Sequence, residues 1–232
     1  MSWLIYALIC AIFTSAAALV QKKSLIKQHA MEFSASLALV NFLLSIPLFF
    51  FVDFSNVTFF ALIAIFVVSF FGSIAFLLIA KSIRHMEISA ASPLLVLGPG
   101  ISALLAFLIL GEKLTMLQII GIGTLIFGSY ILELKNHHDL FHPLRVIKQS
   151  KYVYFILLAL LIYGFCGVFD RALLTRFNVE PLTYIAFVHV FIAFHFLILM
   201  TLFHDGIKGI KFGIKTAGPW ILVVALLTVG YR

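Results

Sequence analysis

Long apolar stretches, separated by short polar connections, run through the whole sequence. The helices that this pattern predicts cover residues 3–20, 33–52, 57–80, 88–110, 116–132, 152–169 and 182–203, and an eighth begins near Ala217. A helix needs about 20 mostly apolar residues to cross the hydrocarbon core of a bilayer. The pattern therefore predicts an all-α, multi-pass membrane protein.

The two stretches between residues 88 and 132 form the most regular pair. The first has 23 residues without a charge, and the five residues GEKLT connect it to 17 apolar or small residues. So short a connection makes the two helices antiparallel and brings them into contact. Gly98-Pro99-Gly100 interrupts the first helix, because proline lacks an N–H and clashes with the preceding turn. We expect a kink there, near mid-membrane, bordering a cavity.

Composition and charge support the membrane interpretation. Apolar residues make up 63% of the chain and charged residues 11%, and the mean hydropathy is +1.18. The net charge of +7 is concentrated in the connections, as expected for membrane-flanking basic residues and not for a nucleic-acid partner. Cys10 and Cys166 lie in apolar stretches, which argues against a disulfide framework or a Cys metal site. There is no GxxxxGK[ST] motif in the sequence, and we expect no cofactor.

The order of the stretches repeats along the chain. Residues 152–200 fall over residues 3–51 at an offset of 149, with span, basic connection and span in the same order. A five-span unit has an odd number of crossings, so successive repeats must run through the membrane in opposite directions. Inverted repeats are a transporter architecture. We expect a first repeat over residues 1–134, a polar connection over 135–151 and an incomplete second repeat over 152–232.

At the end of the first repeat, SPLLVLGPGISALLAFLILGEKLT followed by QIIGIGTLIFGSYIL resembles an EamA domain of the drug/metabolite transporter superfamily. The residues that carry the resemblance are Pro93, Gly111, Glu112, Leu114, Thr115, Gly121 and Gly128. It implies a ten-span carrier in the cell membrane that moves small organic solutes by alternating access, with a cavity between two five-span repeats. The resemblance names no substrate, and it leaves open whether the protein forms a homodimer.

The second repeat is expected to be truncated after about three spans. Residues 217–232 would give about 24 Å of helix, short of the roughly 30 Å hydrocarbon core. A complete second repeat should add about 60 residues and a second hairpin like that of residues 88–132. We therefore expect an apolar groove where those spans belong, and no transport by this chain alone.

Polar and backbone-breaking residues within the spans are the candidates for the cavity wall, because polar groups are unfavourable against lipid. We expect the cavity to be lined by Tyr6, Asn41, Ser69, Ser73, Gly98, Pro99 and Tyr163. Asn41 either lines the cavity or hydrogen-bonds a neighbouring helix, and both interpretations stay open. Catalytic residues and metal ligands are not expected.

Other polar groups have structural explanations beside functional ones. Thr115 and Glu112 suit the N-terminus of the following helix as cap and dipole partner, with a proton or substrate carboxylate as the alternative for Glu112. His189 and His195 point about 120° apart on a helix, so they cannot share a metal. We expect helix–helix hydrogen bonds from both, with a proton relay as the alternative.

Two clusters of charged and histidine residues lie in or next to the polar connections. His137, His138, Asp139 and His142 have the composition of a metal cluster, but they lack an apolar shell and indicate a solvated connection. Asp170 and Arg171 end a span, where an ion pair or interfacial position explains them and a gate is the alternative.

Charge and resemblance disagree about orientation. Connections after odd-numbered spans hold 12 Lys and Arg and those after even-numbered spans hold 3, which places the N-terminus outside, whereas the family implies that it is inside. Two other functions are alternatives to a carrier. A fully packed bundle would favour a membrane scaffold or assembly partner, and an intramembrane enzyme would need a nucleophile–base pair or a metal set.

Overall fold

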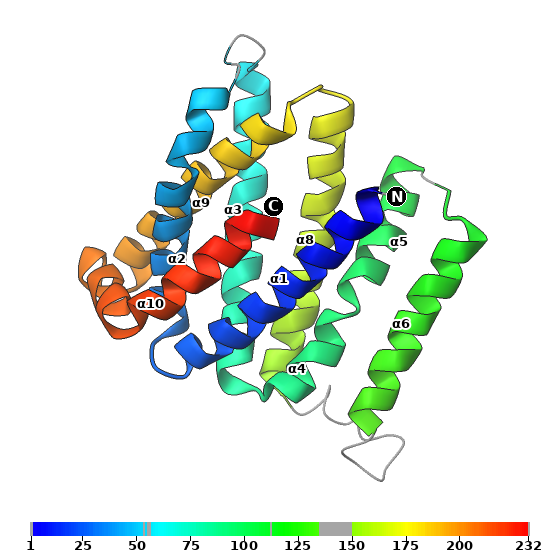
Figure 1. Cartoon of the computed structure of the whole chain (residues 1–232), viewed down its shortest axis with the longest axis horizontal. Helices are drawn as coiled ribbons and strands as arrows, with labels where there is room; N and C mark the ends of the chain where they lie inside the picture. The colour runs from blue at the N-terminus through cyan, green and yellow to red at the C-terminus, as the bar shows by residue number, and fades with distance from the viewer. Residues whose placement is uncertain (1, 53, 55–56, 112, 135–149, 232) are drawn as a thin grey trace. The chain divides into compact units, whose positions relative to one another are not determined.

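In the computed structural model, the described residues are 2–52, 54, 57–111, 113–134 and 150–231, and their regular structure is entirely helical (Figure 1). The elements are α1 (Ser2–Leu25), α2 (Ala30–Ser45), the 3₁₀-helix η1 (Ile46–Phe51), α3 (Phe59–His85), α4 (Ile88–Leu95), α5 (Gly98–Leu110), α6 (Met116–Leu134), α8 (Lys151–Thr175), α9 (Pro181–Phe203) and α10 (Ile207–Tyr231).

Seven stretches among the described residues are long and apolar enough to cross a membrane. They are Ile5–Leu25, Ala30–Phe51, Phe59–His85, Ala90–Leu110, Lys151–Thr175, Pro181–Phe203 and Ile207–Gly230. In α6 the apolar part, Met116–Ile131, is shorter. The predicted all-helical, multi-pass class is confirmed.

The chain forms two compact units, which we call unit 1 and unit 2. Unit 1 comprises Met1–Ser73 with Leu173–Arg232, and unit 2 comprises Ile74–Ala172. Each unit therefore contains elements from both of the repeats that the sequence predicts. The repeat boundaries at residues 134 and 152 stay a prediction.

Unit 1 is built around α2 and α10. Helix α10 packs along both α1 and α2, and α2 also packs against α9 (Figure 1). Gly213 permits the α2–α10 contact, because a Cβ there would lie 2.5 Å from Ser36 Oγ and 3.1 Å from the Glu32 carbonyl oxygen. Ser36 Oγ donates a hydrogen bond to the Ile210 carbonyl at 3.2 Å across the same contact.

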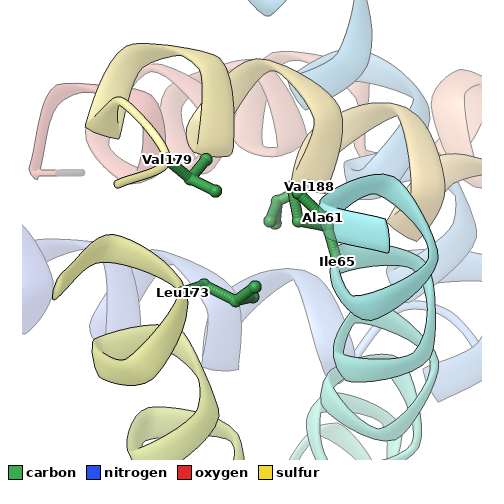
Figure 2. Close-up of a cluster of buried hydrophobic side chains, with 5 residues drawn as sticks. All are labelled: Ala61, Ile65, Leu173, Val179 and Val188. Carbon is green, nitrogen blue, oxygen red and sulfur yellow. The ribbon is translucent and has the colours of Figure 1, made fainter. Parts of the chain in front are cut away.

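The apolar core of unit 1 also joins α3, the end of α8 and α9. Figure 2 shows Leu173 and Val179 pointing toward Ala61 and Ile65 of α3, with Val188 of α9 completing the cluster. The Val179 N–H donates to the Leu173 carbonyl at 3.2 Å, which holds the turn between α8 and α9 closed.

Unit 2 packs α4, α5 and α6 with α8 and the last turns of α3. Its buried cluster consists of Met86, Ala91, Val153, Ile156 and Leu160. Ser82 Oγ donates to the Tyr152 carbonyl at 2.9 Å, joining the end of α3 to the start of α8. Within the expected hairpin, α6 runs antiparallel to α5 (Figure 1), and a Cβ at Gly100 would lie 3.2 Å from Ile122 of α6.

The predicted interruption at Gly98-Pro99-Gly100 is present. Helix α4 ends at Leu95 and α5 begins at Gly98, with Pro99 at the start of α5. Proline is tolerated in a first helical turn, where its missing N–H has no intrahelical partner to lose. One sequence segment thus becomes two helices joined at Val96 and Leu97.

Several predicted helix boundaries differ from the structure: α1 and α3 each continue five residues past their predicted ends, and two other boundaries bear on other predictions. The last helix begins at Ile207 and not near Ala217, because Gly209, Ile210, Gly213 and Ala217 recur at helical spacing and form its buried face. A kink at Ala217 divides α10 into residues 207–216 and the part that the sequence predicts as the last span, so the shortness of that span stays a prediction. Ala217 has φ −137° and ψ 21°, and Pro219 follows, so α10 is kinked there.

The other wrong boundary is that of the sixth predicted span, which continues past residue 169 to Thr175 in α8. Asp170 and Arg171 consequently lie within a helix and not at its end, and each makes an interaction in the structure.

Candidate functional site

Five polar side chains of unit 1 lie at the middle of their helices. The midpoint of Ala30–Phe51 falls beside Asn41, that of α3 lies between Ser69 and Ser73, and that of α9 lies between His189 and His195. At a rise of 1.5 Å per residue, each of the five is within about 5 Å of its helix midpoint along the axis. If these helices span a bilayer, the five residues lie near its midplane. We call them the mid-height polar set.

Burial leaves part of this set without hydrogen-bond partners. Asn41 is 9% exposed, and its Oδ1 accepts no hydrogen bond from the described residues. Ser73 Oγ donates to the Ser69 carbonyl at 2.7 Å, whereas the buried Ser69 Oγ has no such partner. An unsatisfied buried polar group costs about 1–3 kcal/mol. The set therefore has hydrogen-bonding capacity that the described protein residues do not use.

His195 is surrounded by aromatic rings. Its ring centroid lies 4.5 Å from that of Phe66, 5.4 Å from that of Phe70 and 6.0 Å from that of Phe194. Both ring nitrogens are buried without a hydrogen-bond partner among the described residues. The expected helix–helix hydrogen bond is therefore wrong for His195, because aromatic contacts from α3 and α9 occupy its surroundings.

The structure distributes the seven predicted cavity residues over both units. Asn41, Ser69 and Ser73 lie in unit 1, each near the middle of its helix, and Tyr6 lies in the same unit but is 68% exposed on α1. Gly98, Pro99 and Tyr163 belong to unit 2. A Cβ at Gly98 would lie 3.3 Å from Leu160 of α8, so this glycine faces a neighbouring helix. Cavity lining by these residues stays a prediction.

The motif residues of the hairpin have identifiable structural roles. Gly111 ends α5 with φ 68°, in the left-handed region that glycine adopts without strain. Thr115 Oγ1 accepts from the Gln118 N–H at 3.3 Å, and Gln118 Oε1 accepts from the Thr115 N–H at 2.8 Å. This reciprocal pair is a capping box, so the predicted capping role of Thr115 is confirmed.

The remaining motif residues show no close packing role of this kind. Pro93 lies inside α4, and a Cβ added at Gly121 or Gly128 would meet no atom within 4 Å. Glu112 lies outside the described residues, as do His137, His138, Asp139 and His142. In the part of the chain that the structure describes, no three His, Cys, Asp or Glu residues are grouped so that they could hold a metal ion.

The sequence pattern places Ser34 on one face of the second span with Asn41, but sequence reasoning missed the buried Thr183 and its correspondence to Ser34. Ser34 in α2 and Thr183 in α9 are buried, and neither side-chain oxygen has a hydrogen-bond partner in the described residues. The two positions are 149 residues apart, which is the offset that superposes the two halves of the sequence. A comparison of polar residues at positions 149 apart in the sequence would have identified this pair.

Apolar helices of membrane-spanning length, with buried polar groups near their midpoints, define a multi-pass membrane protein. A comparison with protein families is more specific, because the model of the EamA-like transporter family matches residues 1–134. The chain belongs to the EamA-like transporter family. A search of curated proteins found no significant match to the chain. The family consists of membrane transporters of small solutes and is generally non-enzymatic.

Proposed function

We propose that the protein binds a small organic solute at the mid-height polar set and carries it across the cell membrane by alternating access. The observation that carries this proposal is the unused hydrogen-bonding capacity of Asn41 and Ser69 within a membrane-transporter family. Polar groups buried at bilayer depth are unfavourable unless a partner satisfies them. A solute with hydroxyl, amide or amine groups would supply that partner.

Alternating access requires two halves that can rock against each other, and we propose that inverted repeats provide them. The first repeat would begin with α1, α2 and α3, and the second with α8, α9 and α10. In this arrangement α1 corresponds to α8, α2 to α9 and α3 to α10. If the repeats are related by symmetry, the α10–α1 contact corresponds to an α3–α8 contact, and the α10–α2 contact corresponds to an α3–α9 contact. The α2–α9 contact corresponds to itself.

Side chains of unit 1 make contacts of all these kinds, although α10 packs more closely on α1 and α2 than α3 does on α8 and α9. Helix α10 packs on α1 and α2, α2 packs on α9, and the buried cluster of Ala61, Ile65, Leu173 and Val188 joins α3 to α8 and α9. The buried hydroxyls of Ser34 and Thr183 occupy corresponding positions in α2 and α9. Together these features support the internal pseudo-symmetry.

Solute binding can be tested with the purified full chain in detergent. Thermal unfolding is measured against a panel of amino acids, nucleosides, sugars, organic acids and amines. A ligand at 100 times its Kd stabilises the folded state by about 2.7 kcal/mol, which corresponds to a rise in Tm of roughly 5–10 °C for a chain of this size.

A pair of amide variants assigns the binding to the mid-height set. Asn41→Leu should abolish the stabilisation by the active solute class. Gln28→Leu is the matched control, because Gln28 is also a buried amide of unit 1 but lies outside the helices, before α2. A stabilisation that survives in Asn41→Leu, or the absence of any stabilising class, would refute the proposal.

A further inference from the structure

A cleft in unit 1 lies at the helix ends, away from the mid-height polar set. Its volume is about 710 Å³, within the roughly 300–1,000 Å³ range of small-molecule sites. It lies between the end of η1, the first turns of α3, the α8–α9 turn and the first turn of α9. The residues that line it are Phe51, Val57, Ala61, Ile65, Phe177, Asn178, Val179, Glu180 and Thr183. We call it the helix-end cleft.

The floor of this cleft is apolar and fixed. Ala61, Ile65 and Val179 belong to the buried cluster shown in Figure 2. Phe177, at the rim, packs on Phe60 of α3 with their ring centroids 5.2 Å apart. Asn178 adopts φ 51°, a left-handed conformation that asparagine tolerates better than most residues. The turn that presents Phe177 and Glu180 is therefore held on both sides.

Two polar groups of the cleft have unused bonding capacity. Thr183 is 3% exposed, and its Oγ1 has no hydrogen-bond partner among the described residues. Glu180 occupies the N-cap position of α9, but its side chain makes no capping hydrogen bond. Among the described residues that line the cleft, Glu180 is also the one that carries a charge.

We propose that the helix-end cleft binds an ammonium group attached to an apolar body. The Glu180 carboxylate would pair with the ammonium charge, Thr183 Oγ1 would accept one of its N–H bonds, and Phe51 and Phe177 would face it with aromatic surface. The apolar body would lie on Ala61 and Ile65. An anionic ligand is disfavoured, because it would meet the Glu180 carboxylate.

This chemistry has two sources, a free organic amine or the headgroup of an aminophospholipid. The helix ends are where headgroups lie if the helices span a bilayer. The site does not depend on transport, and Asn41→Leu should leave it unchanged.

The test measures binding of 2-phenylethylamine and of its neutral analogue 2-phenylethanol to the purified full chain by titration calorimetry. The amine should bind about tenfold more tightly than the alcohol, because the alcohol cannot pair with the carboxylate. Glu180→Gln should remove that preference. Thr183→Val, which keeps the shape of the side chain, should weaken amine binding about threefold.

Glu87→Gln is the matched control. Glu87 is also an exposed N-cap residue without a side-chain capping hydrogen bond, but it lies at the start of α4 in unit 2. It should leave the preference for the amine intact. Equal binding of the amine and the alcohol, an unchanged preference in Glu180→Gln, or an equal loss in Glu87→Gln would overturn the proposal.

Nanodiscs distinguish the two sources. Weaker amine binding in phosphatidylethanolamine discs than in phosphatidylglycerol discs, with a smaller difference in Glu180→Gln, would show that the headgroup competes for the cleft beyond the attraction of the amine to the anionic lipid. That result would support the lipid source. Equal amine binding in both discs, with the Glu180 dependence retained, would support the free amine. If amine binding in discs no longer depended on Glu180, that result would contradict both the lipid source and the free-amine source.

Discussion

The contact between α2 and α10 should tolerate no side chain at position 213. In Gly213→Ala the new Cβ would lie 2.5 Å from Ser36 Oγ and 3.1 Å from both Gln28 Oε1 and the Glu32 carbonyl oxygen. Gln28 and Ser36 can rotate their side chains, but the Glu32 carbonyl belongs to the backbone. Relief of that contact therefore requires α10 to move away from α2 by a few tenths of an ångström.

Three terms set the magnitude of this effect. Forcing an extra methyl group into a packed contact costs about 1–3 kcal/mol. Rotation of Ser36 breaks its hydrogen bond to the Ile210 carbonyl, which contributes about 1 kcal/mol. Alanine in a helix interior gains roughly 0.5–1 kcal/mol over glycine. The net destabilisation is about 1–3 kcal/mol, or a fall in Tm of roughly 2–10 °C.

The assay is thermal unfolding of the purified protein in detergent, followed by tryptophan fluorescence. Trp220 on α10 is a suitable reporter, because Lys23 Nζ of α1 lies 3.9 Å from its ring centroid. Gly72→Ala in α3 is the control, since a Cβ there would meet no atom within 4 Å. It should leave Tm unchanged or raise it slightly.

A double-mutant cycle separates the contact from general effects. Ser36→Ala removes the atom nearest to the new methyl group, so Gly213→Ala should cost at least about 0.5 kcal/mol less in that background than in the wild type. A Gly213→Ala variant as stable as Gly72→Ala would refute this description of the α2–α10 contact.

Three further substitutions should have smaller, separable effects on thermal unfolding. Thr115→Ala should lower stability by about 0.5–2 kcal/mol through loss of the α6 cap, and an unchanged Tm would contradict the capping box. Gly111→Ala should lower stability by about 1 kcal/mol, because residue 111 has φ 68°. Gly111→Asn should lower stability less, and equal losses in the two variants would argue against the left-handed cap. His195→Phe should leave stability unchanged or raise it, because the imidazole nitrogens are buried among aromatic rings, and a large loss would reveal a hydrogen bond.

The features of the fold that could be predicted are those with strong local causes. Apolar length predicts the spans, Gly98-Pro99-Gly100 predicts the break between α4 and α5, and Thr115 predicts the cap of α6. In each case a backbone or desolvation requirement acts within a few residues, so no knowledge of neighbouring helices is needed.

The start of α10 could have been predicted and was missed. Lys208, Lys211 and Lys215 give residues 204–216 the composition of a connection. Gly209, Ile210, Gly213 and Ala217 nevertheless recur at helical spacing and form a buried face, whereas the three lysines are exposed. Composition and periodicity disagreed in this segment, and periodicity was the better guide.

The partners of the candidate site could not be predicted in the same way. The aromatic surroundings of His195 come from residues of α3 that lie more than 120 positions away in the chain. Polarity alone suggested a hydrogen bond for His195. Whether a buried polar side chain finds an aromatic ring, a hydroxyl or no partner depends on packing that the local sequence does not encode.

The most direct test of the account is whether water and solute reach the mid-height polar set in the membrane. Cys10 and Cys166 are first replaced by alanine, and either Ser69→Cys or Ala75→Cys is added. Both positions are three residues from the midpoint of α3 and buried, but Ser69 carries an unpartnered hydroxyl and Ala75 is packed. The proposed carrier predicts that the thiol of the Ser69→Cys variant reacts with a small hydrophilic thiol reagent in liposomes and that the active solute protects it. The thiol of the Ala75→Cys variant should stay unreactive. Reaction of the Ser69→Cys variant only after denaturation would contradict a solute site at this depth.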